Sequence, residues 1–477
     1  MELLVPLNNQ SQTPMYEQIY HFIKEEIRKG NLEAGERLPS SRLLSENLKV
    51  SRSTVQMAYD QLLAEGYMET IPYKGCFVAD TCGLVTIEGD TSSSKMPSAF
   101  LSSEPDKEQQ SVWDGIIDFS PRGIDLENFP FGIWRKLSRD TLVDDNREMF
   151  GTGDPKGECS LREAIRTYLH SARGVNCQAE QIIVGAGNEY LLMLLSRVLG
   201  ENHKIAMENP TYKQAYRVLS GQGYPVCPVS MDKYGMRTDF LRESGADIAY
   251  VMPSHQYPTG IVMPVKRRKE LLDWAAEREG RYLIEDDYDS EFRYKGMPIP
   301  ALQGMDKKGR VIYIGTFSKS IAPAIRIGFL VLPPSLLEIY EKKASFYSST
   351  VSRIDQNILY EFLVKGHYER HLNRMRAVYK GKHDALLSAL KKLEDRFTIQ
   401  GEHAGLHVLL SHKKGVSEQM LTELAAEQGV KVYGLSSYLI SDSSPGLPPT
   451  LILGYATLTQ EEIEKGILLL NEAWKDT

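Results

Sequence analysis

A lysine and an aspartate each follow an apolar stretch of the kind that forms a buried strand. Lys319 lies in a Ser/Thr-rich turn after VIYIGTF, and Asp286 lies near the end of the stretch LIEDD. A lysine amine can attack an aldehyde, and a carboxylate can keep a pyridine nitrogen protonated. Because open α/β sheets bind ligands beyond the carboxyl ends of their strands, we expect the two side chains to share a pocket. Asp287 is the adjacent alternative to Asp286.

Other residues suited to this pocket would bind a phosphate and a flat ring. Three side chains near the lysine are of phosphate-binding types: Thr316, Ser318 and Arg326. A turn between QIIV and the helical stretch EYLLMLL would place a helix N-terminus at the phosphate, and it contains Ala186, Gly187 and Asn188. Tyr212 could stack on the ring, although a lone tyrosine is more often a packing residue, and Tyr288 could reach a ring oxygen. The set predicts a site for pyridoxal 5′-phosphate (PLP), with Lys319 forming the Schiff base.

A second group of residues, near the start of the chain, suits DNA. Apolar residues recur at helical spacing over 14–28, and further helices are expected over 39–48 and 52–65. In a helix-turn-helix the start of the second helix lies near the base edges. Side chains of suitable type there, on the preceding helix and in the following hairpin are Arg42, Ser51, Arg52, Ser53, Thr54, Gln56 and Lys74. Arg52 suits phosphate or guanine and Gln56 suits adenine.

These helices need a shared core and a following hairpin to be positioned. The apolar set expected to hold the helices together is Leu38, Leu43, Leu44, Leu48, Val50, Val55, Ala58, Leu62 and Leu63. Residues 67–71 and 76–79 predict two short strands around a Lys-Gly turn, which would form a wing. The alternative is a plain three-helix bundle with an exposed arginine.

The length and net charge of the chain limit the number of domains and the way in which it can bind DNA. The chain has 477 residues, so two or three domains are expected. Its net charge is −7, and its first 80 residues hold eight Lys/Arg against eleven Asp/Glu. DNA binding must therefore rest on a local cluster of cations rather than on bulk charge. Five cysteines without CxxC spacing fit a reducing cytoplasm, and neither a signal peptide nor a membrane span is expected.

Composition and periodicity suggest the domain organisation. We expect a DNA-binding domain over 1–80, a flexible linker rich in Ser, Pro, Glu and Gln over 81–113, and a large domain over 114–477. Strand and helix patterns alternate through the large domain, which predicts an α/β fold with a mostly parallel sheet. The last hundred or so residues predict a smaller α+β lobe. The pairs His367/His371 and His403/His407 lack a third ligand, so no metal site is expected.

Both halves resemble known families. Residues 35–67 resemble the winged helix of GntR regulators through Leu-Pro-Ser, Val-Ser-Arg-x-Thr-Val and Tyr-x-x-Leu-x-x-Glu-Gly. The landmarks VGAG, ENPTY, PSHQYPTG, EDDYDSEF and TFSKSIAPAIR resemble fold type I aminotransferases. Together they resemble the MocR/GabR-type regulators. The resemblance implies PLP on Lys319, a small-molecule effector, a homodimer, a double-stranded DNA operator and a wing tip at Lys74 and Gly75.

The chain departs from the aminotransferase pattern at several positions. Thr457 stands where those enzymes hold the substrate carboxylate with an arginine, and Lys213 and Gln214 stand where regulators of the γ-aminobutyrate type have one. Thr152 replaces a tyrosine that reaches the partner's phosphate, and Tyr257 replaces an asparagine. We therefore expect partial transaminase activity at most. The expected effector is PLP itself, or an amine or amino-acid-type ligand held in another way.

Three hypotheses follow. The first is a PLP-dependent transcriptional regulator. The second is an active PLP-dependent aminotransferase with an appended DNA-binding module. The third is a DNA-binding protein whose large domain only dimerises, which would leave the lysine, the aspartate and the phosphate-binding residues without a role.

Overall fold

The protein consists of two compact units. The computed structural model describes residues 3, 5–8, 11, 13–72, 74–79, 115–142, 147–294, 299–401, 405–441 and 448–477. The N-terminal unit is Met1–Gln109 and the large unit is Gln110–Thr477. The predicted linker 81–113 lies outside the described residues, so the domain boundaries at 80 and 114 stay predictions.

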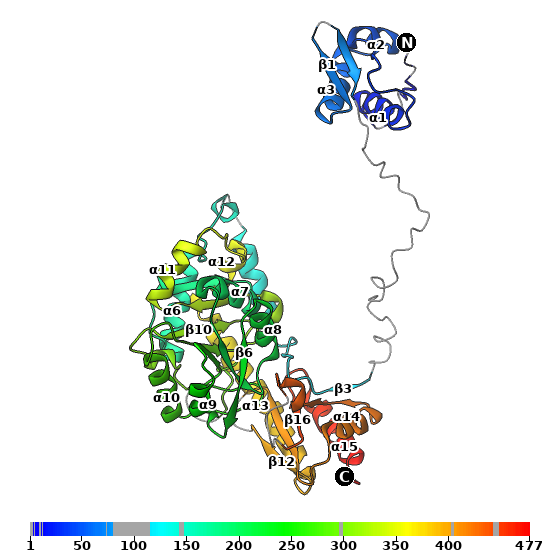
Figure 1. Ribbon diagram of the computed structural model, residues 1–477. Coiled ribbons are helices and arrows are strands. Elements are labelled where there is room, and N and C mark those ends of the chain that lie inside the picture. The colour runs from blue at the N-terminus through cyan, green and yellow to red at the C-terminus, as the bar shows by residue number, and fades with distance from the viewer. Residues whose placement is uncertain are drawn as a thin grey trace. The chain divides into compact units, whose positions relative to one another are not determined.

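The N-terminal unit contains three helices followed by a two-stranded hairpin (Figure 1). Its elements are α1 (Met15–Arg28), α2 (Ser41–Leu48), α3 (Arg52–Ala64), β1 (Met68–Ile71) and β2 (Gly75–Val78). The side chains of Ser40 and Ser51 cap α2 and α3 by accepting hydrogen bonds from Leu43 N and Thr54 N. The antiparallel strands complete the expected wing.

The core of the N-terminal unit is formed where the three helices meet. Its most deeply buried side chains are Ile19, Ile23, Leu44, Val55, Ala58 and Leu62. The expectation for Leu43 is wrong, because 48% of this residue is exposed. Adjacent residues of a helix point about 100° apart, so a short helix such as α2 turns Leu44 toward α3 and leaves Leu43 outside.

An eight-stranded sheet forms the centre of the large unit. In spatial order its strands are β4 (Ile182–Gly185), β11 (Gly328–Val331), β10 (Val311–Thr316), β9 (Tyr282–Asp287), β8 (Ile248–Val251), β5 (Ile205–Asn209), β6 (Val226–Asp232) and β7 (Gly235–Met236). The five strands from β10 to β6 run parallel, and β11 runs antiparallel to both of its neighbours. The expectation of a mostly parallel α/β sheet is confirmed.

Helices pack on both faces of this sheet (Figure 1). They are α5 (Phe131–Thr141), α6 (Cys159–Arg173), α7 (Asn188–Leu199), α8 (Lys213–Gly221), α9 (Thr238–Glu243), α10 (Val265–Ala276), α11 (Pro334–Lys343), α12 (Arg353–Val364) and α13 (His367–Leu390). Short 3₁₀ turns are η1 (Arg147–Phe150), η2 (Ala179–Gln181), η3 (Gln303–Met305), η4 (Pro323–Ile325), η5 (Lys391–Leu393) and η6 (Leu435–Tyr438).

A smaller lobe follows α13. Its antiparallel sheet has the order β12 (Phe397–Gln400), β13 (His407–His412), β16 (Thr450–Gly454) and β15 (Tyr433–Gly434), and its helices are α14 (Glu418–Glu427) and α15 (Gln460–Ala473). In addition, β14 (Val430–Lys431) pairs in parallel with β3 (Ile117–Asp118). The start of the large unit therefore belongs to the small lobe, which the sequence pattern assigned to the last hundred residues alone.

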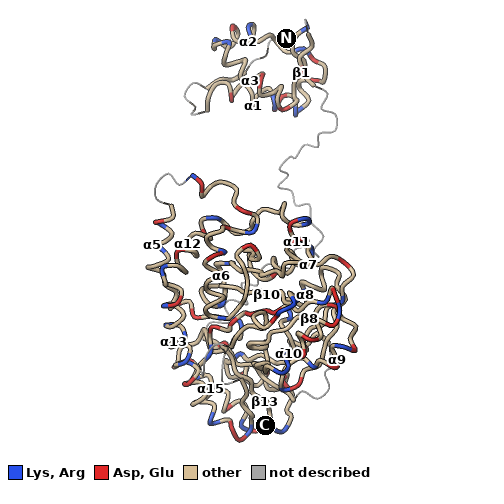
Figure 2. The backbone as a smooth tube through the Cα atoms, turned by 90° about the vertical axis from the view of Figure 1, so that its left-hand side faces the viewer, with Lys and Arg blue, Asp and Glu red and all other residues tan. Residues whose placement is uncertain are grey.

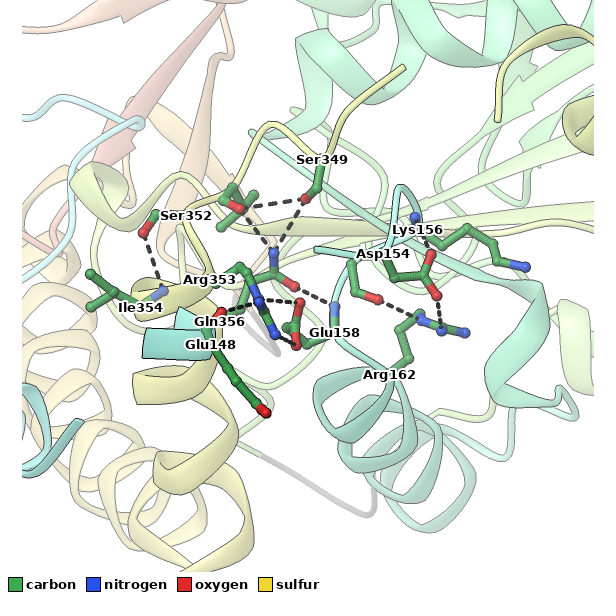
Figure 3. A network of polar contacts seen from close by, with 12 residues as sticks. Glu148, Asp154, Lys156, Glu158, Arg162, Ser349, Ser352, Arg353, Ile354 and Gln356 are labelled. Atoms are coloured by element: carbon green, nitrogen blue, oxygen red, sulfur yellow. Dashed lines mark hydrogen bonds and ion pairs between the residues drawn. The ribbon is translucent and has the colours of Figure 1, made fainter. Parts of the chain in front are cut away.

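Polar contacts hold the segment after η1 in place (Figure 3). Arg162 pairs with Asp154 at 2.8 Å, and Arg353 of α12 pairs with Glu158 at 2.8 Å. The side-chain oxygen of Gln356 accepts a hydrogen bond from Glu158 N. These contacts fix the residues around 154–158 between α6, α12 and the edge of the sheet at β4.

Charge is mixed on both units. Figure 2 shows lysine and arginine interspersed with aspartate and glutamate along each of them. None of the helices in the described ranges has the length and apolar character required to cross a membrane.

The core of the N-terminal unit yields a test of its packing. Leu62→Ala should lower the free energy of unfolding of this unit by roughly 2–5 kcal/mol, because Leu62 is fully buried and its truncation leaves a cavity. Leu43→Ala, at the exposed position, should change it by less than about 0.5 kcal/mol. Hydrogen exchange of peptides from α1 and α3 in the full chain measures both. Equal effects of the two variants would contradict the packing described above.

Candidate functional site

A pocket of about 300 Å³ lies beyond the carboxyl ends of β9 and β10. Eight of the ten residues expected to bind the cofactor line it: Asn188, Tyr212, Asp286, Tyr288, Thr316, Ser318, Lys319 and Arg326. The other two, Ala186 and Gly187, adjoin it through contacts with Arg326. Pocket-lining residues that sequence reasoning did not assign to the site are Arg122, Glu189, Gln214, Met252, Tyr257 and Pro323.

Asp286 is a buried carboxylate at the end of β9, with one oxygen unsatisfied. Its Oδ2 accepts hydrogen bonds from Tyr250 and from Asn188 Nδ2, the latter at 3.1 Å. Its Oδ1 has no hydrogen-bond partner among the described residues. Burial raises the pKa of Asp286 to about 6. A protonated pyridine nitrogen would satisfy Oδ1 and favour the charged carboxylate, so this position fits a pyridinium ring.

The carboxylate of the neighbouring Asp287 is bound by side chains in the protein interior. It pairs with Arg173 at 2.7 Å and accepts a hydrogen bond from Tyr313 at 2.5 Å. Adjacent residues of a strand point to opposite faces, so only one of the two aspartates can face the pocket. Asp286 lines the pocket and Asp287 does not, so the geometry favours Asp286 of the two alternatives.

Lys319 lies in the turn after β10, with its amine inside the pocket. The Nζ donates hydrogen bonds to the carbonyl oxygens of Arg122 at 2.7 Å and Pro121 at 3.5 Å. Burial lowers the pKa of Lys319 to about 8, against a smaller opposing effect of the Asp289 charge. A larger fraction of neutral amine is therefore present near neutral pH, which is what nucleophilic attack on a carbonyl requires.

The phosphate-binding residues gather at the start of α7. Gly187 has φ +88° and precedes the helix, and a Cβ atom there would lie 2.8 Å from an Arg326 guanidinium nitrogen. Only glycine allows this close approach. Arg326 pairs with Glu189 at 2.8 Å, and Thr316 Oγ1 accepts a hydrogen bond from Ser318 N. The helix N-terminus, the hydroxyls and the guanidinium fit a phosphate, for which Glu189 is the competing anion.

Aromatic side chains form the remaining wall of the pocket. Tyr212 packs edge-on against Tyr257 with ring centroids 6.1 Å apart, and the Tyr257 hydroxyl donates to the Tyr438 hydroxyl at 3.1 Å. The Tyr288 hydroxyl lies 3.0 Å from His255 Nδ1, which is 2.9 Å from the buried carboxylate of Asp289. This chain of contacts fixes the orientation of Tyr288 at the pocket.

The residues expected to contact DNA belong to α2, to the start of α3 with its cap, and to the hairpin. Arg52 is the first residue of α3 and is exposed, as are Ser53 and Gln56. Gln56 donates a hydrogen bond to Asp60 at 2.8 Å. Arg42 pairs with Glu46 at 3.2 Å, so these two side chains must leave partners on their own helices in order to reach DNA.

Ser51 and Lys74, two of the residues expected to contact DNA, lie at the cap of α3 and in the hairpin turn. The Ser51 hydroxyl accepts a hydrogen bond from Thr54 N and lies within hydrogen-bonding distance of the hydroxyls of Ser53 and Thr54, so it also serves as the cap of α3. Lys74 is exposed in the hairpin turn, and a Cβ atom on Gly75 would lie 3.4 Å from the Arg37 side chain. Arg37 is therefore a further cation beside the wing tip, which sequence reasoning missed.

Family comparisons cover both units. Residues 125–468 match the family described as aminotransferase class I and II, and residues 15–78 match the bacterial regulatory proteins of the gntR family. The gntR match implies DNA binding, and the aminotransferase fold implies a PLP site. The two units define a class of DNA-binding proteins that carry an aminotransferase fold on the same chain.

Similar proteins extend over nearly the whole chain. The uncharacterized HTH-type transcriptional regulator YdeL of Bacillus subtilis (strain 168) is 39% identical over 478 residues, covering 100% of both chains. The probable rhizopine catabolism regulatory protein MocR of Rhizobium meliloti is 33% identical over 479 residues, covering 99% of this chain and 96% of that one. The multiple substrate aminotransferase of Thermococcus profundus matches with a TM-score of 0.69 and 26% identity, covering 80% of this chain and 97% of that one. The chain belongs to the MocR-type family of helix-turn-helix transcriptional regulators.

The environment of Lys319 predicts an unusual pH dependence of its reactivity. In the PLP-free chain, trace acetylation of Lys319 by acetic anhydride should rise with pH and reach its half-maximum near pH 8, because only the neutral amine reacts. Peptide mass spectrometry across the pH range measures this, with the exposed Lys269 as internal reference. Asp289→Asn should move the midpoint downward, because the Asp289 charge raises the lysine pKa. A midpoint above pH 10 would show that the amine is not desolvated.

Proposed function

We propose that this protein is a transcriptional regulator whose large unit holds PLP through Lys319 and whose DNA binding responds to PLP or to an amine or amino-acid-type effector. One observation carries the proposal. The unsatisfied carboxylate oxygen of Asp286 and the desolvated amine of Lys319 face the same pocket, as a pyridinium nitrogen and an aldehyde on one ring require.

Each pocket residue has a role in holding the cofactor. Asp286 would accept a hydrogen bond from the ring nitrogen, and Tyr288 would donate one to the ring oxygen. Tyr212 would cover a face of the ring. The phosphate would be held by the start of α7 with the residues Ala186, Gly187, Asn188, Thr316, Ser318 and Arg326. When bound, PLP supplies an aldehyde carbon and an electron-withdrawing ring.

The contacts of Lys319 suggest how the pocket communicates with the small lobe. Pro121 and Arg122, whose carbonyl oxygens accept the lysine hydrogen bonds, follow β3, and β3 pairs with β14 of the lobe. A ligand that engages the amine would replace these hydrogen bonds, and it would thereby favour one position of the small lobe over another. It can shift the equilibrium only through different affinities for the two states. Because β3 follows the N-terminal unit along the chain, this segment is suited to pass the change to the DNA-binding unit.

The proposed regulator acts as a homodimer of three-part chains. We propose a homodimer acting on DNA in the cytoplasm, with a DNA-binding domain over 1–80, a linker over 81–113 and a large domain over 114–477. The large aromatic side chains of Phe150 and Phe346 are 76% and 69% exposed, and burying them against a second copy would remove apolar surface from water.

A working aminotransferase is the second candidate, and the lysine, aspartate and tyrosine of the pocket favour it. Thr457 weighs against efficient turnover of amino acids, because a threonine cannot form the bidentate pair that an arginine makes with a carboxylate. Sustained conversion of an amino acid with 2-oxoglutarate over many turnovers would favour the enzyme.

The attachment of PLP can be located directly. After incubation with PLP and reduction by borohydride, mass spectrometry should find the added mass on Lys319, since its amine is desolvated and faces the ring site. Lys319→Ala should abolish this modification, while Lys269→Ala, on the exposed face of α10, should leave it unchanged. Modification of a different residue, or of none, would overturn the cofactor proposal.

The DNA-binding surface predicts a salt dependence. Arg52→Ala should weaken binding to a random-sequence DNA duplex, most strongly at low salt, because one phosphate contact fewer reduces the slope of log K against log[salt] by about 0.9. Fluorescence anisotropy at several salt concentrations measures the slope. Lys29→Ala, beyond the end of α1, is the matched control and should leave affinity and slope unchanged. If Arg52→Ala behaves like this control, Arg52 does not contact the backbone.

A further inference from the structure

We propose that Arg122 is the anion-binding residue of this pocket and that it selects effectors in which an amine carries a carboxylate. The inference rests on the proposed function, because it concerns the same pocket. It names the chemistry of the effector and a residue that recognises it, neither of which follows from PLP binding alone.

The position of Arg122 places a cation beside the reactive amine. Its side chain lines the pocket together with Lys319, and its own carbonyl oxygen accepts a hydrogen bond from Lys319 Nζ at 2.7 Å. The guanidinium and the lysine amine are therefore linked through one residue. An amine effector held at the PLP aldehyde beside Lys319 would bring its substituents into the pocket that the Arg122 side chain also lines.

The charge of Arg122 is available to a ligand. Three cationic side chains line the pocket: Arg122, Lys319 and Arg326. Arg326 is paired with Glu189 at 2.8 Å, and the Lys319 amine serves covalent attachment. Arg122 forms no ion pair with any carboxylate in the described parts of the chain. An arginine in a concave site without an anionic partner favours a ligand that supplies the anion.

Hydroxyl groups around the guanidinium complete a site for a carboxylate. Arg122 donates a hydrogen bond to the Tyr438 side chain, and Tyr257 lies close by with its hydroxyl bonded to that of Tyr438. The planar guanidinium matches both oxygens of a carboxylate, and a tyrosine hydroxyl can donate to one of them. The arrangement thus favours a carboxylate over a neutral group of similar size.

The packing of Thr457 explains why the arginine comes from this segment. The Thr457 methyl group lies 2.2 Å from the position that a Cβ atom on Gly123 would occupy. The backbone after Arg122 therefore passes directly over Thr457, and a larger residue at position 123 would push it away. Thr457 cannot hold a carboxylate itself, but its small size lets the Arg122 segment approach the pocket.

Through the same contacts, the effector's carboxylate would link the small lobe to the sheet of the large unit. Arg122 follows β3 and Tyr438 ends η6, so both belong to the side of the pocket formed by the small lobe, whereas Lys319 extends from the sheet of the large unit. An effector whose amine is held at the PLP aldehyde beside Lys319 and whose carboxylate pairs with Arg122 would bridge these two parts. An amine without a carboxylate would occupy the side of Lys319 alone and leave the lobe contacts of Arg122 unchanged.

Binding of stable conjugates to the PLP-free full-length chain tests this inference without any turnover. The probes are N-(5′-phosphopyridoxyl) derivatives of glycine, β-alanine and γ-aminobutyrate, each paired with the derivative of methylamine, ethylamine or propylamine that lacks only the carboxylate. Isothermal titration gives Kd for each pair. For at least one pair the wild-type chain should bind the carboxylate form about tenfold more tightly or better, as expected for a charge-assisted hydrogen bond. The pair with the largest ratio reports the spacing between amine and carboxylate.

Two variants assign the preference to the arginine. Arg122→Gln should bind both members of every pair with equal affinity, and its unchanged affinity for the alkylamine conjugates shows that the pocket is intact. Arg139→Gln, at an exposed position of α5, should keep the wild-type ratio. A ratio near one in wild type, or a ratio that survives in Arg122→Gln, overturns the inference and leaves the PLP proposal standing. If no conjugate binds at all, the PLP proposal fails, and the inference fails with it.

Discussion

The rest of the pocket depends on the position of a single amine, that of Lys319. Strand β10 brings the lysine to the edge of the sheet, and carbonyl oxygens from Pro121 and Arg122 hold its Nζ there. Those carbonyls belong to a segment that follows β3, which the small lobe holds through β14. One set of hydrogen bonds therefore connects the lysine at the edge of the sheet to a segment that the small lobe holds.

The two aspartates at the end of β9 have different surroundings: one is paired in the protein interior and the other lines the pocket. Asp287 is satisfied by Arg173 and Tyr313 in the interior, where an unpaired carboxylate would be strongly destabilising. Asp286, one residue earlier, has an oxygen that accepts no hydrogen bond from the residues the structure describes, and burial raises its pKa to about 6. Because Asp287 is paired inside the protein, Asp286 is the aspartate that lines the pocket.

Local signals in the sequence predicted much of the molecule. The three helices of the N-terminal unit begin and end within a residue or two of their predicted limits. The starts of α2 and α3 are locally encoded, because the caps Ser40 and Ser51 act within one turn. Lys319 and Asp286 were found because each follows an apolar strand. Leu43 was misassigned because periodicity alone does not show which of two adjacent leucines a short helix buries. Glu189 was overlooked although it follows Asn188 directly, and its adjacency to a predicted phosphate site could have revealed it.

The sequence by itself determined the three N-terminal helices, the wing, the alternation of strands and helices in the large unit and the residue types of the pocket, since these depend on spacing within a few residues. The tertiary structure alone decided which aspartate faces the pocket, that β3 joins the lobe, and that Arg122 meets Lys319 and Tyr438. These residues are separated by roughly two hundred to three hundred positions of chain. Their approach follows from strand pairing and from the close passage of Gly123 over Thr457, and neither leaves a pattern in the residues nearby.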